Sequence, residues 1–154
     1  MTVKEYLRQI HCIEYKIRLI ESEITEMREN LTAIGGAPEG ERVQTSKAGD
    51  TMPDRLSRVI EKEEKRKRLL IEYTETREKI IDQILSMTDR RHVELLYKRY
   101  VENKRLEQIA CECNYSYTHI KRMHGQALQE FAKLVDTEVS KKKYSYQMSP
   151  KDML

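Results

Sequence analysis

Apolar residues recur at alternating steps of three and four along the first part of the chain. The run starts at Val3 and continues without a break to Ile34. Its members are Val3, Tyr6, Ile10, Ile13, Ile17, Ile20, Ile24, Met27, Leu31 and Ile34. A heptad repeat of this length, with Glu, Lys and Arg between the apolar positions, predicts a coiled-coil helix. Gly35-Gly36 and Pro38 predict its end.

A second heptad seam follows a polar linker at about residues 35–53. Asp54 is suited to cap this second helix, which we expect to reach about Met87. The seam consists of Leu56, Val59, Glu63, Arg66, Leu70, Tyr73, Arg77, Ile80, Ile84 and Met87. Charged residues in a seam weaken it but can set register and partner choice. The sequence therefore leaves open whether the two helices pair within one chain or between chains.

The charged run at residues 61–68, Glu-Lys-Glu-Glu-Lys-Arg-Lys-Arg, lies within this second helix. Acidic and basic residues three or four positions apart on a helix form ion pairs. The run therefore predicts a solvated, ion-paired face rather than a basic patch.

Shorter helices are predicted in the segment at residues 88–135. Thr88-Asp89 can cap a helix that ends near Val101, and a helix from Leu106 to Cys113 follows. Asn114 tolerates the left-handed conformation of a tight turn, and we expect Tyr115 to fill the corner. Ser116 is a good cap for the last helix. The inward stripe of that helix is Ile120, Met123, Ala127, Leu128 and Phe131.

Composition and charge indicate the fold class, the location and the kind of partner. The 154 residues include five Gly, three Pro and no Trp, which favours an all-α fold with long helices over a sandwich or barrel. No apolar stretch is long enough for a membrane span, so we expect a cytoplasmic protein. Residues 1–87 hold 16 Lys/Arg and 17 Asp/Glu, whereas residues 88–134 hold 9 and 6. The net charges of −1 and +3 direct the search for a polyanion partner to the second segment.

The segment at residues 85–134 resembles region 4 of the sigma-70 family. The likeness is carried by Arg99-Tyr100-Val101-Glu102-Asn103-Lys104-Arg105-Leu106-Glu107-Gln108-Ile109-Ala110, then Asn114-Tyr115-Ser116 and Ala127-Leu128. Gly40 to Ser46 and Leu96 to Tyr100 extend the resemblance to small prophage and mobile-element proteins, similar to late-transcription regulators of the ArpU and RinA type. This resemblance implies a helix-turn-helix domain. The first 87 residues lack the aromatic-rich pattern of a promoter-melting domain, so the chain is not a self-sufficient sigma factor.

The resemblance implies that the helix after Ser116 reads double-stranded DNA in the major groove. The expected base contacts are Tyr117, Thr118, His119 and Arg122. The expected phosphate contacts are Lys98, Arg99, Lys104, Arg105, Ser116 and Lys121. Arginine can hydrogen-bond bidentately to guanine, and lysine can neutralise phosphate.

The sequence as a whole predicts a DNA-binding transcriptional regulator that self-associates through its N-terminal coiled coil. The expected parts are the coiled-coil arm at residues 1–87, the helix-turn-helix domain at residues 88–135 and a basic, disordered tail at residues 136–154. No catalytic constellation, cofactor motif or metal site is recognised. The alternatives are a module that binds RNA polymerase or a sigma factor, and a DNA-packaging protein similar to small terminase subunits.

Overall fold

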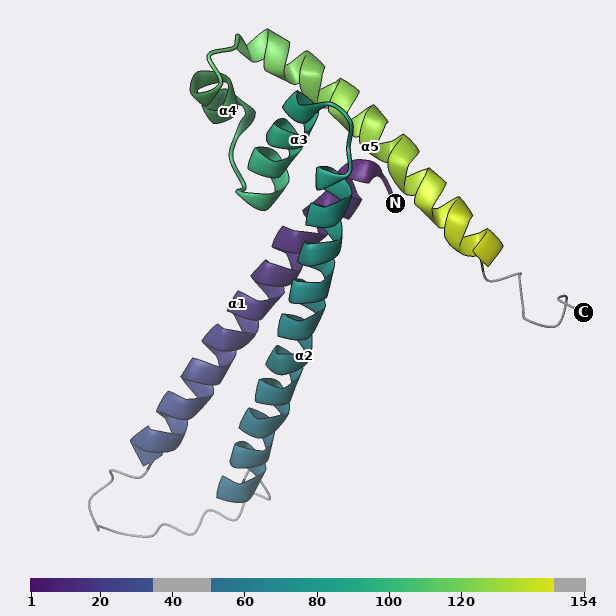
Figure 1. The fold of residues 1–154 in the computed structure, drawn as a ribbon. Helices are drawn as coiled ribbons and strands as arrows, with labels where there is room; N and C mark the ends of the chain where they lie inside the picture. Colours follow the sequence, from purple (N-terminus) through teal and green to yellow (C-terminus); the bar gives the residue numbers. More distant parts are fainter. Residues whose placement is uncertain (35–50, 146–154) are drawn as a thin grey trace, which may run out of the picture. The chain divides into compact units, whose positions relative to one another are not determined.

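The computed structural model describes residues 1–34 and 51–145, with side chains described for residues 1–33 and 51–136. The described elements are all helical, which confirms the all-α prediction (Figure 1). They are α1 (Val3–Ile34), α2 (Met52–Leu85), α3 (Arg90–Leu96), η1 (Tyr97–Val101), α4 (Leu106–Glu112) and α5 (Tyr117–Ser145). Among the described residues, none of the helices contains an apolar stretch of the length that a bilayer requires. Gly40 to Ser46 lies outside the described residues.

Contacts divide the chain into two compact units. The first unit, which we call the hairpin unit, comprises residues 12–74 and contains most of α1 and α2. The second, which we call the helical-domain unit, combines residues 1–11 with the chain from Glu75 onward.

Threonine caps begin α1 and α2. Thr2 Oγ1 accepts a hydrogen bond from the Glu5 amide (3.3 Å), and the Glu5 carboxylate accepts one from the Thr2 amide (2.7 Å). Thr51 and Asp54 repeat this reciprocal arrangement. The prediction that Asp54 is the cap is therefore wrong by three positions. Thr51 is the cap, and Asp54 is the third residue of the helix, whose carboxylate completes the capping box. A hydrogen bond from the Thr2 amide lowers the pKa of the Glu5 carboxyl group, and hydrogen bonds from the Thr51 hydroxyl and amide lower that of Asp54.

In the hairpin unit, α1 and α2 pair within one chain. Their ion pairs join Glu21 to Arg66, Glu23 to Lys62 and Arg28 to Glu63. Between the first and last of these pairs the partner moves back along α2 from Arg66 to Glu63 while α1 advances from Glu21 to Arg28, as an antiparallel hairpin requires. The α1 seam is buried as predicted, at Ile13, Ile17, Ile20 and Ile24.

The α2 seam of the hairpin unit differs from the prediction at two leucines. Leu56 is 52% exposed and Leu70 is 41% exposed, whereas the neighbouring Leu69 is half-buried. Ion pairs from Lys62 and Arg66 to α1 accompany this shift, which turns the contact face of α2 toward Leu69. One apolar side of α2 is left exposed as a result.

The helical-domain unit has its own apolar core. Leu95 of α3, Ile109 and Ala110 of α4, and Ile120 and Met123 of α5 pack together. The inward stripe predicted for the last helix is buried at Ile120, Met123, Ala127 and Phe131, and Leu128 is half-buried. Leu7 is also fully buried, although it lies outside the predicted α1 seam.

The predicted helix from Asp89 to Val101 consists of two kinds of helix. Asp89 caps it as expected, because its carboxylate accepts a hydrogen bond from the Arg91 amide (2.9 Å). From Tyr97 to Val101 the chain widens into a π-helix, and the Glu102 amide donates to the Tyr97 carbonyl. Asn103 then adopts a left-handed conformation with φ 56°. Pure periodicity gives no sign of this wider turn, which often occurs at functional sites.

The last helix is longer than the predicted domain. α5 continues to Ser145, so residues 136–145 are helical rather than part of a disordered tail. The remainder of the predicted tail lies outside the described residues.

Candidate nucleic-acid interface

The turn between α4 and α5 fixes the start of α5. Asn114 has φ 55°, the left-handed conformation predicted for it. The Tyr115 amide donates to the Ala110 carbonyl (3.0 Å) and the Asn114 amide donates to the Cys111 carbonyl (3.4 Å). This is the hydrogen-bond pattern of a Schellman motif, which satisfies carbonyls at the end of a helix. Ser116 Oγ then accepts from the His119 amide (3.2 Å), so the predicted cap of α5 is confirmed.

Glutamine rather than arginine completes the start of α4. Arg105 occupies the cap position, but a guanidinium has no acceptor for a backbone amide. The Gln108 side-chain oxygen instead accepts from the Arg105 amide (2.9 Å). The Arg105 side chain is exposed, and it makes no ion pair with any described residue.

The first turns of α5 present a polar face to solvent. The buried Ile120 and Met123 turn inward, and the predicted base-contact residues lie on the exposed side. That exposed set is Tyr117, Thr118, His119, Lys121 and Arg122. Lys121 and Arg122 make no ion pair within the described part of the chain. Their charges therefore remain available to a ligand.

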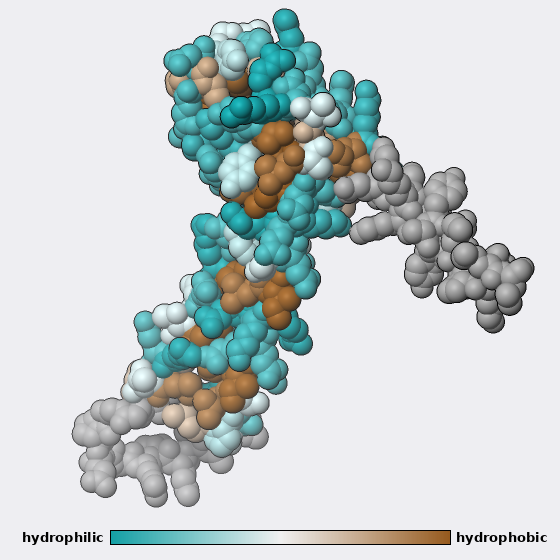
Figure 2. Space-filling view, in the orientation of Figure 1, coloured by the Kyte–Doolittle hydropathy of each residue, from teal (hydrophilic) through white to brown (hydrophobic). Residues whose placement is uncertain are grey.

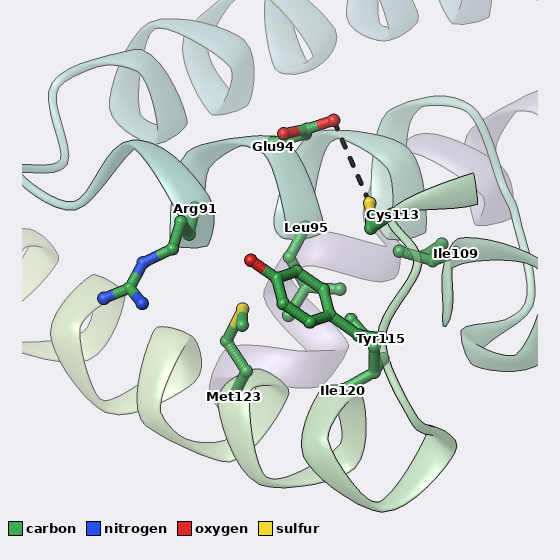
Figure 3. A pocket seen from close by; sticks show the side chains of 8 residues that line it. All are labelled: Arg91, Glu94, Leu95, Ile109, Cys113, Tyr115, Ile120 and Met123. Atoms are coloured by element: carbon green, nitrogen blue, oxygen red, sulfur yellow. Dashed lines mark hydrogen bonds between the residues drawn. The ribbon is translucent and has the colours of Figure 1, made fainter. Parts of the chain in front are cut away.

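Tyr115 covers the corner between α3, α4 and α5 but does not seal it. Figure 3 shows its ring among the apolar side chains of a cavity of about 160 Å³, lined also by Leu95, Ile120 and Met123. Tyr115 remains 41% exposed, and its ring centroid lies 4.8 Å from that of His119. His119 thus packs against the turn while keeping an exposed edge.

Two predicted phosphate contacts are held by carboxylates. Lys98 Nζ lies 2.9 Å from Glu94 and 3.2 Å from Glu112. Lys104 Nζ lies 2.8 Å from Glu102 and 3.0 Å from Glu112. The hydrogen bonds to Glu94 and then Glu112 raise the pKa of Lys98, although desolvation opposes them. The hydrogen bonds from Lys104 and Lys98 lower the pKa of Glu112.

The remaining phosphate candidates have different surroundings. Arg99 Nη1 donates to the Lys104 carbonyl (3.0 Å), and its guanidinium carbon lies 5.8 Å from the centroid of the Tyr100 ring. Arg99 therefore supports the loop before α4. The Ser116 hydroxyl caps α5. Arg105 and Lys121 are therefore the predicted phosphate residues whose charged groups have neither a hydrogen bond nor an ion pair with another described residue.

Glu112 is the residue of this region that sequence reasoning missed. It bridges Lys98 and Lys104, which come from η1 and from the loop before α4. Neither lysine lies three or four positions from Glu112, so the helical spacing of charges gives no signal for the bridge. Only the packing of α4 against η1 brings these charges together.

A histidine link between α3 and α5 was missed as well. His92 Nδ1 lies 2.5 Å from Glu130 Oε2, and Glu130 Oε1 also accepts from the Thr88 amide (2.8 Å). Burial raises the pKa of Glu130, but the hydrogen bonds from His92, Thr88 and Asp89 outweigh it and lower the value. The Glu130 side chain of α5 thereby connects to the start of α3 through hydrogen bonds.

Comparison of the chain with protein-family models, with curated proteins and with solved structures gives no match.

Proposed function

We propose that the chain is a sequence-specific DNA-binding transcriptional regulator of phage or mobile-element type, in which α4 and α5 act as a helix-turn-helix. The observation that carries the proposal is the exposed, unpaired start of α5 beyond a capped and hydrogen-bonded turn. A helix inserted into the major groove needs such a face, because side chains that are engaged internally cannot reach base edges.

The proposed division of labour follows from charge and exposure. Arg122 reads a base, with Tyr117, Thr118 and His119 beside it. Arg105 and Lys121 contact phosphate, since neither has a competing carboxylate among the described residues. Lys98 and Lys104 play a smaller part, because each is held by two carboxylates. DNA has to displace Glu94 and Glu112 from Lys98, and Glu102 and Glu112 from Lys104.

The test of base reading is Arg122→Ala. We expect a loss of roughly 1–3 kcal/mol on the selected site and relaxed preference at one base pair, with little change on random DNA. Binding sites are first selected from a random DNA pool, and affinities are then measured by fluorescence anisotropy beside random competitor. Lys65→Ala, on the hairpin unit, is the matched loss of one positive charge and should leave the discrimination unchanged. Equal losses on specific and random DNA for Arg122→Ala would remove the readout assignment.

The same measurement separates DNA reading from docking on RNA polymerase or a sigma factor. A regulator that reads DNA retains a discrete site as salt is raised from about 50 to 200 mM, although its affinity falls. Absence of any selected site, together with capture of polymerase core by the purified chain, would instead favour the protein-binding alternative.

A further inference from the structure

The outward side of α2 in the hairpin unit carries a second seam that α1 does not cover. It consists of Ile60, Glu64, Lys67 and Ile71, at steps of four, three and four. Ile60 is 49% exposed and Ile71 is 60% exposed, and the two charged residues are exposed as well. Hydrophobic patches alternate with hydrophilic surface along the visible face of the hairpin in Figure 2. Residues at this spacing form one stripe along a helix.

The charges of this stripe differ in their surroundings from those on the inward side. Lys62, Glu63 and Arg66 form ion pairs with α1. Glu64 and Lys67 form no ion pair with any described residue. The charged run of α2 is therefore divided between a satisfied inner side and an outer side whose charges have no described partner.

The stripe is complementary to the same stripe of a second copy that runs in the opposite direction. A second copy placed antiparallel, centred between residues 65 and 66, sets Ile60 opposite Ile71 and Glu64 opposite Lys67. Each pair then occurs twice. A parallel arrangement in register sets Glu64 against Glu64 and Lys67 against Lys67, and like charges in facing positions destabilise a helix pair. The charge pattern thus selects the antiparallel orientation.

Neighbouring residues extend the same surface. Leu56 and Leu70, the seam leucines that α1 leaves exposed, lie beside the stripe. Residues 57 and 74, the next facing pair, are Ser and Thr, which permit close approach. From Leu56 to Thr74 the contact would be ~27 Å long at 1.5 Å per residue. This length gives a helix pair several turns of contact.

We infer that a second copy of the chain packs antiparallel on this stripe, α2 against α2, to form a two-fold symmetric dimer. Apolar contacts at Ile60 and Ile71 provide the attraction, and the Glu64–Lys67 pairs fix orientation and register, as polar seam residues do in coiled coils. Only the role of the dimer rests on the proposed function. That role is to pair two DNA-binding modules and raise their avidity.

The test uses charge reversal in the full-length chain, without DNA. Glu64→Lys and Lys67→Glu each turn two attractive pairs into two repulsive ones, so we expect each variant alone to dimerise roughly tenfold more weakly. Mixed together, the two variants restore both pairs and should form a heterodimer about as tight as the original dimer. Sedimentation equilibrium gives the dissociation constants, and one fluorescently labelled partner identifies the heterodimer.

Control variants separate this surface from general effects of charge. Lys65→Glu makes the same charge change as Lys67→Glu but lies about 200° away around the helix, and it should leave dimerisation unchanged. The double variant Ile60→Ser/Ile71→Ser should weaken association while circular dichroism shows unchanged helix content. A chain that stays monomeric at about 200 μM, or a mixture with no preference for the heterodimer, overturns the inference. DNA affinity is measured separately, so failure of the dimer does not count against base reading.

Discussion

At the scale of single residues, the buried pair of Tyr100 and His124 shows how the core sets protonation. The Tyr100 hydroxyl lies 3.0 Å from His124 Nε2, and both side chains are buried. Burial, reinforced by Lys4, Arg99 and Arg8, lowers the pKa of His124 to about 4. Burial also raises the pKa of Tyr100. Both rings are therefore neutral at pH 7, and the tyrosine hydroxyl can donate to the histidine nitrogen.

This pair predicts loss of stability in mild acid. Between about pH 4 and the ordinary histidine pKa of about 6.5, the unfolded chain binds a proton that the folded chain excludes. The free energy of unfolding should therefore decrease as the pH falls through this window, by up to ~3 kcal/mol from His124. Urea unfolding of the full-length protein between pH 4 and pH 7.5 measures this slope.

Substitutions assign the slope to His124. His124→Gln should flatten it, and His119→Gln, which removes an exposed imidazole, serves as the matched substitution. Tyr100→Phe should retain the slope, since burial remains the main cause of the low histidine pKa. An unchanged slope in a folded His124→Gln protein would contradict the assignment.

At the scale of elements, the turn between α4 and α5 depends on one backbone conformation. Asn114 adopts φ 55°, and its own amide and that of Tyr115 donate to carbonyls of α4. Asparagine tolerates this region better than residues with a plain Cβ, and glycine adopts it without strain. The residue at position 114 thus influences the direction in which the proposed recognition helix leaves the turn.

We expect Asn114→Ala to destabilise the fold by about 1 kcal/mol and Asn114→Gly to have a smaller effect. Asn103, which has φ 56°, provides a matched comparison in the preceding loop. Thermal unfolding of the paired variants gives the difference. Equal stability of the alanine and glycine variants would show that the left-handed conformation is not what makes asparagine favourable here.

At the scale of the whole molecule, the sequence divides into a nearly neutral N-terminal segment and a basic segment that follows it. Residues 1–87 carry a formal charge of −1 and residues 88–134 carry +3. Within the basic segment, Glu112 engages two lysines, so its formal charge overstates the number of cations available to DNA. The phosphate contribution to the proposed binding therefore depends on few side chains, chiefly Arg105 and Lys121.

Salt dependence measures that contribution. Arg105→Ala/Lys121→Ala should reduce the slope of log K against log salt by about 2, because each lost phosphate contact removes about one counterion. The control Lys65→Ala/Arg68→Ala removes the same charge from the hairpin unit and should leave the slope unchanged. Equal slopes for the two double variants would mean that net charge, rather than these positions, governs binding.

Local physical rules explain why much of this protein follows from its sequence. Apolar spacing predicts the buried faces of α1 and α5, and residue chemistry predicts the caps at Asp89 and Ser116 and the left-handed Asn114. These features depend on residues within a few positions of one another. Asp54 was misassigned because Thr51, three positions earlier, completes a capping box with it. The proposed base contacts lie on the exposed face of α5 for the same local reason, the helical period.

Tertiary structure alone decided which distant groups meet. Nothing in the heptads specified that α1 and α2 pair within one chain, or that Leu69 rather than Leu70 faces α1. Periodicity likewise could not show that Glu112 joins Lys98 to Lys104, or that His124 lies buried beside Tyr100. Such contacts join residues far apart in the chain, and their energies depend on packing and desolvation that a local pattern does not contain. The sequence determined the helices and the buried faces of α1 and α5, and the fold determined the contact face of α2 and which charges remained free for a partner.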